Sequence, residues 1–277
     1  MTSPIHVTLV PTPVGNLGDI TLRALEVLKN ADAVACEDTR VSAFLLKHYG
    51  IDKPLVRLDQ HTLKERAAGV LERYPRLAFI TDAGTPGIQD PGEELVRMVL
   101  ERGGKVEVLP GPTALIPALV LSGFPTQPFC FEGFLPRDGR ARKERLEEMI
   151  HRPMTSLFYE SPHRLLDTLE ELSKLAGPQR RVSITRELSK KFEETYRGSL
   201  EAALLHFKDG IKGEIVVALE PFVKVEPGVN DFRSLAQEMA LEGQGTRSIR
   251  DELMAAGLRK NDAYMLALEV TGSSGKG

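Results

Sequence analysis

The sequence predicts an α/β protein, with two α/β domains followed by a small helical region. Over the first half of the 277 residues, short apolar runs alternate with stretches of helical spacing. The same alternation resumes after a segment rich in proline and glycine at 123–128, and from Asn230 onward only helical patterns remain. A chain of this length also agrees with about two domains.

The first α/β domain is expected to span 1–122, and its expected elements alternate regularly along the chain. The expected strands are 6–11, 32–38, 76–81 and 105–110, and the expected helices are 19–31, 41–50, 91–104 and 113–123. Asp19 or Thr21 can cap the first helix, and Pro91 stands near the start of the third. Alternation of this kind is typical of a mostly parallel sheet.

A linker is expected at 123–128, and the second α/β domain at 129–226. Its expected strands are 129–136, 155–160, 180–188, 192–199 and 214–221, and its expected helices are 142–151, 163–177 and 200–207. Three short helical patterns, at 232–243, 248–257 and 260–270, form a small helical extension over 230–270. The small residues of 271–277 predict a flexible tail.

Composition excludes several classes of protein. The net charge of -3 argues against a broad basic surface, so we expect no DNA partner. The longest apolar run, near 115–124, is too short to span a bilayer, and the N-terminus does not resemble a signal peptide. Isolated Cys36 and Cys130 indicate a reducing, cytoplasmic location. The histidines lack metal-ligand spacing, so we expect no metal.

Three loops rich in glycine and proline follow expected strands, at 11–21, 80–91 and 110–114. Ligands of open α/β sheets bind beyond the carboxyl ends of the strands. Glycine permits positive φ and a close approach of the backbone, which suits a flat polar ligand such as a nucleoside. The loops could equally be plain strand-to-helix turns. None is a GxGxxG or Walker loop, which disfavours a phosphate cradle.

Six motifs occur in order over about residues 7–222. They are "VPTPVGNLGDITLRALEVL", "CEDTR", "TDAGTPGIQDPG", "LPGPTALIPALVLSGFP", "FEGFLPR" and "FYESPHR". Together they resemble the ribosomal RNA small subunit methyltransferase I group of the tetrapyrrole methylase (class III methyltransferase) superfamily. The resemblance implies two α/β domains with a cleft between them for S-adenosylmethionine, a homodimer, and 2'-O-methylation of a cytidine in the decoding centre of 16S rRNA, so that the partner is the small ribosomal subunit.

The resemblance also implies site residues. The first loop, with Pro11, Pro13 and Gly15, departs from the GxGPG pattern of enzymes that act on tetrapyrroles, and Thr85 stands where their second loop has aspartate. By position in the motifs, the expected cofactor-binding residues are Pro13, Gly84, Thr85, Ile88, Thr113, Ala114 and Phe158.

A ribose hydroxyl is a weak nucleophile, so the reaction needs positioning and a nearby base. The polar candidates at expected strand ends are Glu37, Asp38, Arg40, Asp82, Glu160 and His163, of which Glu37, Asp38, Arg40 and Glu160 are the expected catalytic residues. Each of them could equally serve a helix terminus as a cap or a dipole partner. Asp82 also stands at a strand end and has no assigned role, whereas Asp90 is expected to cap the next helix.

RNA binding needs local positive charge, and the segment 137–145 has five basic residues against two acidic ones. The expected RNA-binding residues are Arg137, Arg140, Arg142, Lys143, Arg164, Arg247 and Lys260. The basic segment could also be a solvated helix start, and the C-terminal helices could support a dimer. Two other functions remain open, a small-molecule (tetrapyrrole-type) methyltransferase and a non-catalytic RNA-binding protein.

Overall fold

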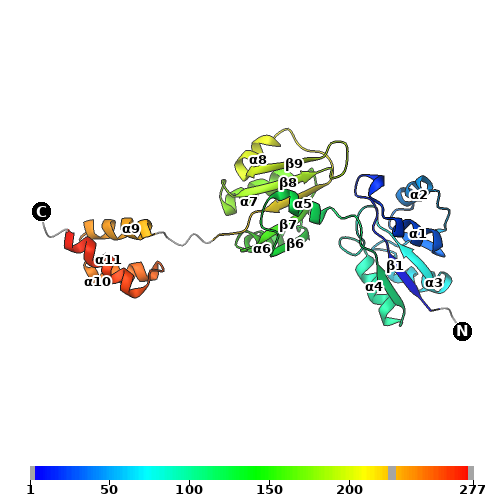
Figure 1. Ribbon diagram of the computed structural model, residues 1–277, viewed down its shortest axis with the longest axis horizontal. Helices are drawn as coiled ribbons and strands as arrows, with labels where there is room; N and C mark the ends of the chain where they lie inside the picture. Colours follow the sequence, from blue (N-terminus) through cyan, green and yellow to red (C-terminus); the bar gives the residue numbers. More distant parts are fainter. Residues whose placement is uncertain (1–3, 224–228, 274–277) are drawn as a thin grey trace. The chain divides into compact units, whose positions relative to one another are not determined.

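The computed structural model describes residues 4–223 and 229–273, and the chain divides into two compact units, 1–222 and 223–277 (Figure 1). Within the described residues, the first unit contains two five-stranded sheets, and the second contains three helices. The expected α/β fold with a helical C-terminal region is confirmed. Of the tail expected at 271–277, the first three residues continue the last helix and 274–277 lie outside the described residues.

The first sheet is entirely parallel, with strand order β3-β2-β4-β1-β5. Its strands are β1 (His6–Leu9), β2 (Ala33–Cys36), β3 (Leu55–Arg57), β4 (Arg76–Phe79) and β5 (Lys105–Val108). The connecting helices are η1 (Leu17–Asp19), α1 (Leu22–Asn30), α2 (Thr39–His48), α3 (Leu63–Arg73) and α4 (Gly92–Glu101). Parallel connections bring the carboxyl ends of all five strands to one edge of the sheet, where the glycine- and proline-rich loops begin.

Helices cover both faces of this sheet. Leu77 and Phe79 of β4 belong to one hydrophobic cluster with residues of α3 and α4, and Ala78 and Ile80 belong to another with residues of α1 and α2. Burial on both faces explains why the strands are continuous apolar runs. The sequence pattern did not predict β3 or α3. The strand β3 is only three residues long and is not fully buried.

The second sheet is mixed, with strand order β6-β7-β10-β8-β9, and among its described strands only β6 and β7 pair in parallel. Its strands are β6 (Phe129–Phe134), β7 (Thr155–Glu160), β8 (Arg181–Arg186), β9 (Glu194–Ser199) and β10 (Ile215–Leu219). The helices packed with it are α5 (Leu115–Ser122), α6 (Gly139–Ile150), α7 (Leu165–Ala176) and α8 (Leu200–His206). Helix α5 thus packs on the second sheet although it directly follows the last strand of the first.

Neighbouring residues of β7 face opposite sides of the second sheet. Phe158 is fully buried in the large cluster formed with α6, α7 and α8. Leu157 and Tyr159 belong to the opposite face, where α5 packs. Successive side chains alternate between the faces of a strand, so a ligand on the α5 side can contact Tyr159 and cannot contact Phe158.

The second unit is a three-helix bundle made of α9 (Val229–Leu241), α10 (Thr246–Ala255) and α11 (Lys260–Ser273) (Figure 1). Its core contains residues from all three helices, among them Phe232, Ile249 and Leu266. This separate core explains why the bundle forms a compact unit of its own. In neither described unit is a helix long and apolar enough to cross a membrane.

A buried polar network joins α6 to the carboxyl end of β7. The Arg142 side chain is 7% exposed and donates to Glu171 at 2.8 Å, to the Thr168 hydroxyl at 2.8 Å and to the Pro136 carbonyl at 3.0 Å. Thr168 in turn donates to the Glu160 carboxylate at 2.7 Å. A buried guanidinium with three partners holds the helix in place against the sheet.

We therefore expect Arg142→Ala to lower the free energy of unfolding by about 3 kcal/mol, because it leaves buried polar partners without a donor. The matched control is Arg140→Ala on the same helix, since the Arg140 side chain is 90% exposed and pairs only with Glu144 in the next turn among described residues. That change should stay within about 0.5 kcal/mol. Urea denaturation followed by circular dichroism measures both, and equal midpoints for the two variants would contradict the role of the network.

Candidate functional site

The glycine- and proline-rich loops are joined to one another at the carboxyl edge of the first sheet. Thr12 and Gly84 exchange two backbone hydrogen bonds, each of 2.9 Å, and the Thr12 hydroxyl donates to the Thr81 carbonyl at 3.1 Å. The Thr85 hydroxyl donates to the Pro112 carbonyl at 2.8 Å, which ties the second loop to the third. The loops are thus a single pre-organised surface and not three independent turns.

The second loop has a backbone that only glycine adopts easily. Gly84 has φ of 81° and Gly87 has φ of 94°, both in the left-handed region. The Asp90 carboxylate accepts hydrogen bonds from the backbone N–H groups of Gly87, Ile88 and Gly92. Asp90 therefore folds the loop back on itself at the start of α4, a structural role close to the cap that the sequence predicts.

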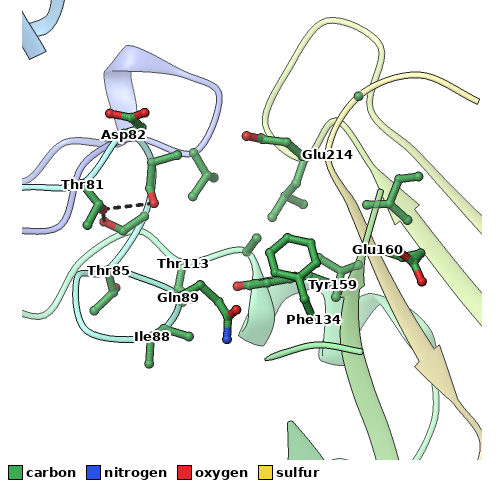
Figure 2. A pocket seen from close by; sticks show the side chains of 18 of the residues that line it. Thr81, Asp82, Thr85, Ile88, Gln89, Thr113, Phe134, Tyr159, Glu160 and Glu214 are labelled. Atoms are coloured by element: carbon green, nitrogen blue, oxygen red, sulfur yellow. Dashed lines mark hydrogen bonds between the residues drawn. The ribbon is translucent and has the colours of Figure 1, made fainter. Parts of the chain in front are cut away.

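These loops form one wall of a cavity of about 480 Å³, which we call the main cavity. Thr85, Ile88 and Gln89 lie on one side of it, and Phe134 and Tyr159 of the second sheet lie on the other (Figure 2). A cavity of this size is typical of small-molecule sites. Its walls combine hydroxyl and backbone groups with aromatic and aliphatic side chains.

The electrostatics of the main cavity are one-sided. Its lining includes the carboxylates Glu37, Asp82, Asp90, Glu160 and Glu214, of which Glu160 is paired with Arg164 and Glu214 with Lys190. Among the described residues, no lysine, arginine or histidine lines it. A bound phosphate would meet no cationic partner here, whereas a positively charged ligand would be stabilised.

Burial and neighbouring negative charges both act on Glu37. Burial, together with the negative charges of Asp90, Asp82 and Asp59, raises the pKa of Glu37 to about 7. A carboxyl group that titrates near neutrality inside a cavity is typical of a functional site. Of the four catalytic candidates, Glu37 is the one with a perturbed carboxylate that lines the cavity.

The other catalytic candidates have structural partners. Asp38 caps α2, and hydrogen bonds from the Arg40 side chain and backbone N–H hold the pKa of Asp38 well below its usual range. The Glu160 side chain is fully buried, accepts from Ser161 and Thr168, and points away from the middle of the cavity (Figure 2). The structure thus places Glu160 in the network of Arg142, where its carboxylate is held by hydrogen bonds from Ser161 and Thr168.

Most of the expected cofactor-binding residues meet at one place. The main cavity is lined by Gly84, Thr85, Ile88, Thr113 and Ala114. Pro13 instead lines a smaller neighbouring pocket, and Phe158 faces the core on the opposite side of its sheet. The prediction that Phe158 binds the cofactor is therefore corrected. Side chains alternate along β7, so Tyr159 and not Phe158 lines the main cavity.

The expected RNA-binding residues divide into two that contact other parts of the protein, the buried Arg142 and the partly exposed Arg164, and an exposed set. Arg142 is 6% exposed, and Arg164 donates to the carbonyls of Leu135 and Pro136, so both guanidinium groups hold the protein together and are not free for phosphates. This burial corrects the assignment of Arg142 to an RNA-facing surface. The remaining members are exposed, namely Arg137, Arg140, Lys143, Arg247 and Lys260.

Several cavity residues were not predicted from the sequence. Gln89, Phe134, Tyr159, Val216 and Glu214 line the main cavity, and all but Gln89 come from the second sheet or the loop before β10. Strand alternation along β7, with Phe158 assigned to the core, could have indicated Tyr159. Nothing in the local sequence marks Glu214. In the described part of the chain, no group of His, Cys, Asp and Glu side chains is arranged to hold a metal ion.

Comparison with known proteins agrees with this geometry. A family model described as Tetrapyrrole (Corrin/Porphyrin) Methylases matches residues 6–204. Proteins named Ribosomal RNA small subunit methyltransferase I are similar over nearly the whole chain. The relative from Haemophilus influenzae is 42% identical and covers 94% of this chain and 95% of its own length. That from Escherichia coli O157:H7 is 41% identical (95% and 95%), and that from Mesorhizobium japonicum 40% identical (97% and 93%).

Solved structures share the fold at lower identity. Uroporphyrin III C-methyl transferase from Thermus thermophilus is 22% identical with a TM-score of 0.58, and the match covers 78% of this chain and 97% of that one. Diphthine synthase is 15% identical with a TM-score of 0.59, covering 78% and 90%. At such identities the likeness establishes the fold alone. The family model and the relatives at 40% identity or more go further, and the chain belongs to the tetrapyrrole methylase family, in its ribosomal RNA small subunit methyltransferase I branch.

Proposed function

We propose that this enzyme transfers a methyl group from S-adenosylmethionine to the 2'-hydroxyl of a cytidine in the decoding centre of 16S rRNA. The observation that carries the proposal is the identity of 40–42%, over more than nine-tenths of each chain, with relatives named as small subunit rRNA methyltransferases. The main cavity supplies the second line of support, because its chemistry suits the methyl donor.

The lining of the main cavity fits S-adenosylmethionine, which combines a sulfonium cation with a flat adenosine group. The carboxylates stabilise positive charge, while Thr85, Thr113 and the backbone of the second loop offer hydrogen-bonding groups. Ile88, Phe134 and Tyr159 provide apolar surface. When bound, the donor supplies a methyl group on a positively charged sulfur, which a hydroxyl oxygen can attack in line.

The residues of the chain act by holding, orienting and excluding water. The ties between Thr12 and Gly84 and between Thr85 and Pro112 keep the second loop rigid before any ligand binds. Pre-organisation of this kind reduces the entropy lost when two reactants are brought into position. The acidic lining favours the positively charged donor over the neutral thioether product, which helps the product to leave.

The RNA is expected to contact the exposed basic residues near the start of α6. Arg137, Arg140 and Lys143 are exposed there, whereas their neighbour Arg142 is committed to the buried network. Arg247 and Lys260 of the helical bundle are exposed as well, and we propose a second contact with RNA at these positions. Contacts of this kind position the RNA through its phosphates.

The proposed reaction is tested with small ribosomal subunits from a bacterial strain that lacks its own enzyme of this branch. The purified protein and S-adenosylmethionine should introduce a single 2'-O-methylcytidine, detected by nucleoside mass spectrometry of 16S rRNA. Methylation of a tetrapyrrole in place of the RNA would favour the small-molecule alternative. Binding of RNA without methyl transfer to either substrate would favour a non-catalytic protein.

Binding of the donor should release a proton because of Glu37. With a pKa of about 7, Glu37 is about half protonated at pH 7, and a bound cation lowers this pKa. We expect up to about half a proton to be released per donor at pH 7, and the affinity to increase as the pH rises through 7. Isothermal titration calorimetry in buffers of different ionisation enthalpy measures the release.

The neutral product S-adenosylhomocysteine is the matched control, since it occupies the same cavity without the sulfonium charge. Its binding should release clearly fewer protons than binding of the donor. The substitution Glu37→Gln should abolish this difference in proton release between the two ligands. Equal proton release with both ligands in the unchanged protein would rule out this electrostatic role of Glu37.

The basic contact is tested by reversing charge at Arg137→Glu, Arg140→Glu and Lys143→Glu together. We expect the KM for small subunits to rise by about tenfold or more at physiological salt, with unchanged binding of S-adenosylmethionine. A control of equal charge change is Lys29→Glu, Lys64→Glu and Arg66→Glu, at exposed positions of α1 and α3. The same KM for both triple variants would show that the start of α6 is not an RNA contact.

A further inference from the structure

We propose that a second pocket beside the main cavity receives the acceptor nucleoside, and that Asp82, which lines both, accepts the proton of its ribose hydroxyl. This inference rests on the proposed function and adds the binding site of the acceptor nucleoside and the general base of the reaction. The second pocket has a volume of about 240 Å³, and we call it the side pocket.

The side pocket and the main cavity are two compartments of one cleft. Both are lined by Val14, Thr81, Asp82, Ala83 and Glu214. The main cavity extends from this shared wall toward Thr85 and Tyr159, and the side pocket extends toward α2. A donor in one compartment and an acceptor in the other would therefore meet at the shared residues.

One segment of the second sheet contributes a residue to each of the two compartments. Leu188 lines the main cavity and Lys190 lines the side pocket, in the segment between β8 and β9. Gly15 lies directly against this segment, because a Cβ at Gly15 would stand 2.4 Å from the Lys190 Cγ atom and 2.6 Å from the Leu188 carbonyl oxygen. Any larger side chain at position 15 would collide with this segment, so the close contact between the first loop and the segment requires glycine.

The side pocket has the surface that an unstacked base requires. Phe44 and Val41 of α2 line it and are 67% and 43% exposed, although the core-facing residues of the same helix are buried. Within the described residues, Phe44 makes no contact with another aromatic ring. Exposed aromatic side chains beside a cleft are the usual platforms on which single-stranded bases stack.

Asp82 lies at the junction and is available for chemistry. It follows β4, is exposed, and accepts a hydrogen bond from the backbone N–H of Asp38, which orients the carboxylate. Unlike Asp38, it forms no ion pair with any residue in the described part of the chain. Figure 2 shows its carboxylate at the edge of the main cavity, away from Phe134 and Tyr159.

The step is a direct displacement. The ribose oxygen forms a bond to the methyl carbon as the carbon–sulfur bond breaks, and the electron pair of that bond stays on sulfur. The hydroxyl proton passes to the Asp82 carboxylate and then to water, so charge and atoms balance. General-base assistance of this kind contributes about 10²–10⁴-fold to a rate.

The base platform is tested with Phe44→Ala. Stacking on an aromatic ring predicts that the KM for small subunits, and their Kd measured by filter binding with S-adenosylhomocysteine present, rise by about tenfold or more. The matched control is Phe192→Ala, because Phe192 is 66% exposed and lies outside both compartments. Calorimetric affinity for S-adenosylmethionine should be unchanged in both variants.

The base is tested with Asp82→Asn, which keeps the shape of the side chain. We expect kcat to fall by about 100-fold while the KM for small subunits and the Kd for S-adenosylmethionine change by less than about threefold. Melting temperatures of the variants check that the fold is intact. A general loss of structure would change the binding constants as well as kcat.

The inference is overturned if Phe44→Ala matches Phe192→Ala, or if Asp82→Asn retains kcat. It is also overturned if Phe44→Ala weakens the donor and not the RNA, since the side pocket would then belong to the donor. Failure of the unchanged protein to methylate small subunits is a different result, which contradicts the proposed function itself.

Discussion

The paired backbone hydrogen bonds between Thr12 and Gly84 are the constraint on which the rest of the site depends. The strands before these residues, β1 and β4, are neighbours in the parallel sheet, so their loops leave the same edge side by side. Two bonds of 2.9 Å then join the loops as a short antiparallel bridge beyond the sheet. Gly84 can make this bridge because it adopts positive φ. Thr85, Asp82 and the first loop are placed by it, and both compartments of the cleft take their shared wall from it.

Much of this arrangement could be predicted from the sequence. Alternating apolar and helical stretches predict the parallel first sheet, and the glycine- and proline-rich loops at its carboxyl edge predict the wall that contains Gly84, Thr85 and Thr113. The pairing between loops could not be predicted, since it depends on which strands are adjacent. The second sheet was harder to predict from the sequence. Its strand order places β10 between β7 and β8, which brings Glu214 to the cleft from far along the chain.

The predicted roles of two site residues, Phe158 and Arg142, were wrong, and in each case the reason lies in the local structure. A one-residue difference along β7 exchanges the faces of the sheet, so Phe158 enters the core and Tyr159 meets the cavity. A run of basic residues does not reveal which of them are buried. Arg142 lies on the inner face of α6 beside Leu146 and Met149, where its guanidinium satisfies Thr168 and the Pro136 carbonyl. The helical spacing of Arg142 from Leu146 and Met149 could have indicated the inner face of α6, but its positive charge favoured an exposed position.

The distribution of charge in the cleft limits which part of an RNA can enter it. The acidic lining that suits a sulfonium donor repels phosphates, and the exposed cations near the start of α6 lie outside that lining. A duplex cannot present a ribose hydroxyl deep in such a cleft without bringing its phosphates close to the carboxylates. An unstacked nucleoside could do so, since its base is uncharged and would meet the exposed apolar surface of Phe44. The same electrostatics that hold the donor therefore favour an acceptor that is splayed out of its helix, with its phosphates kept outside the acidic lining.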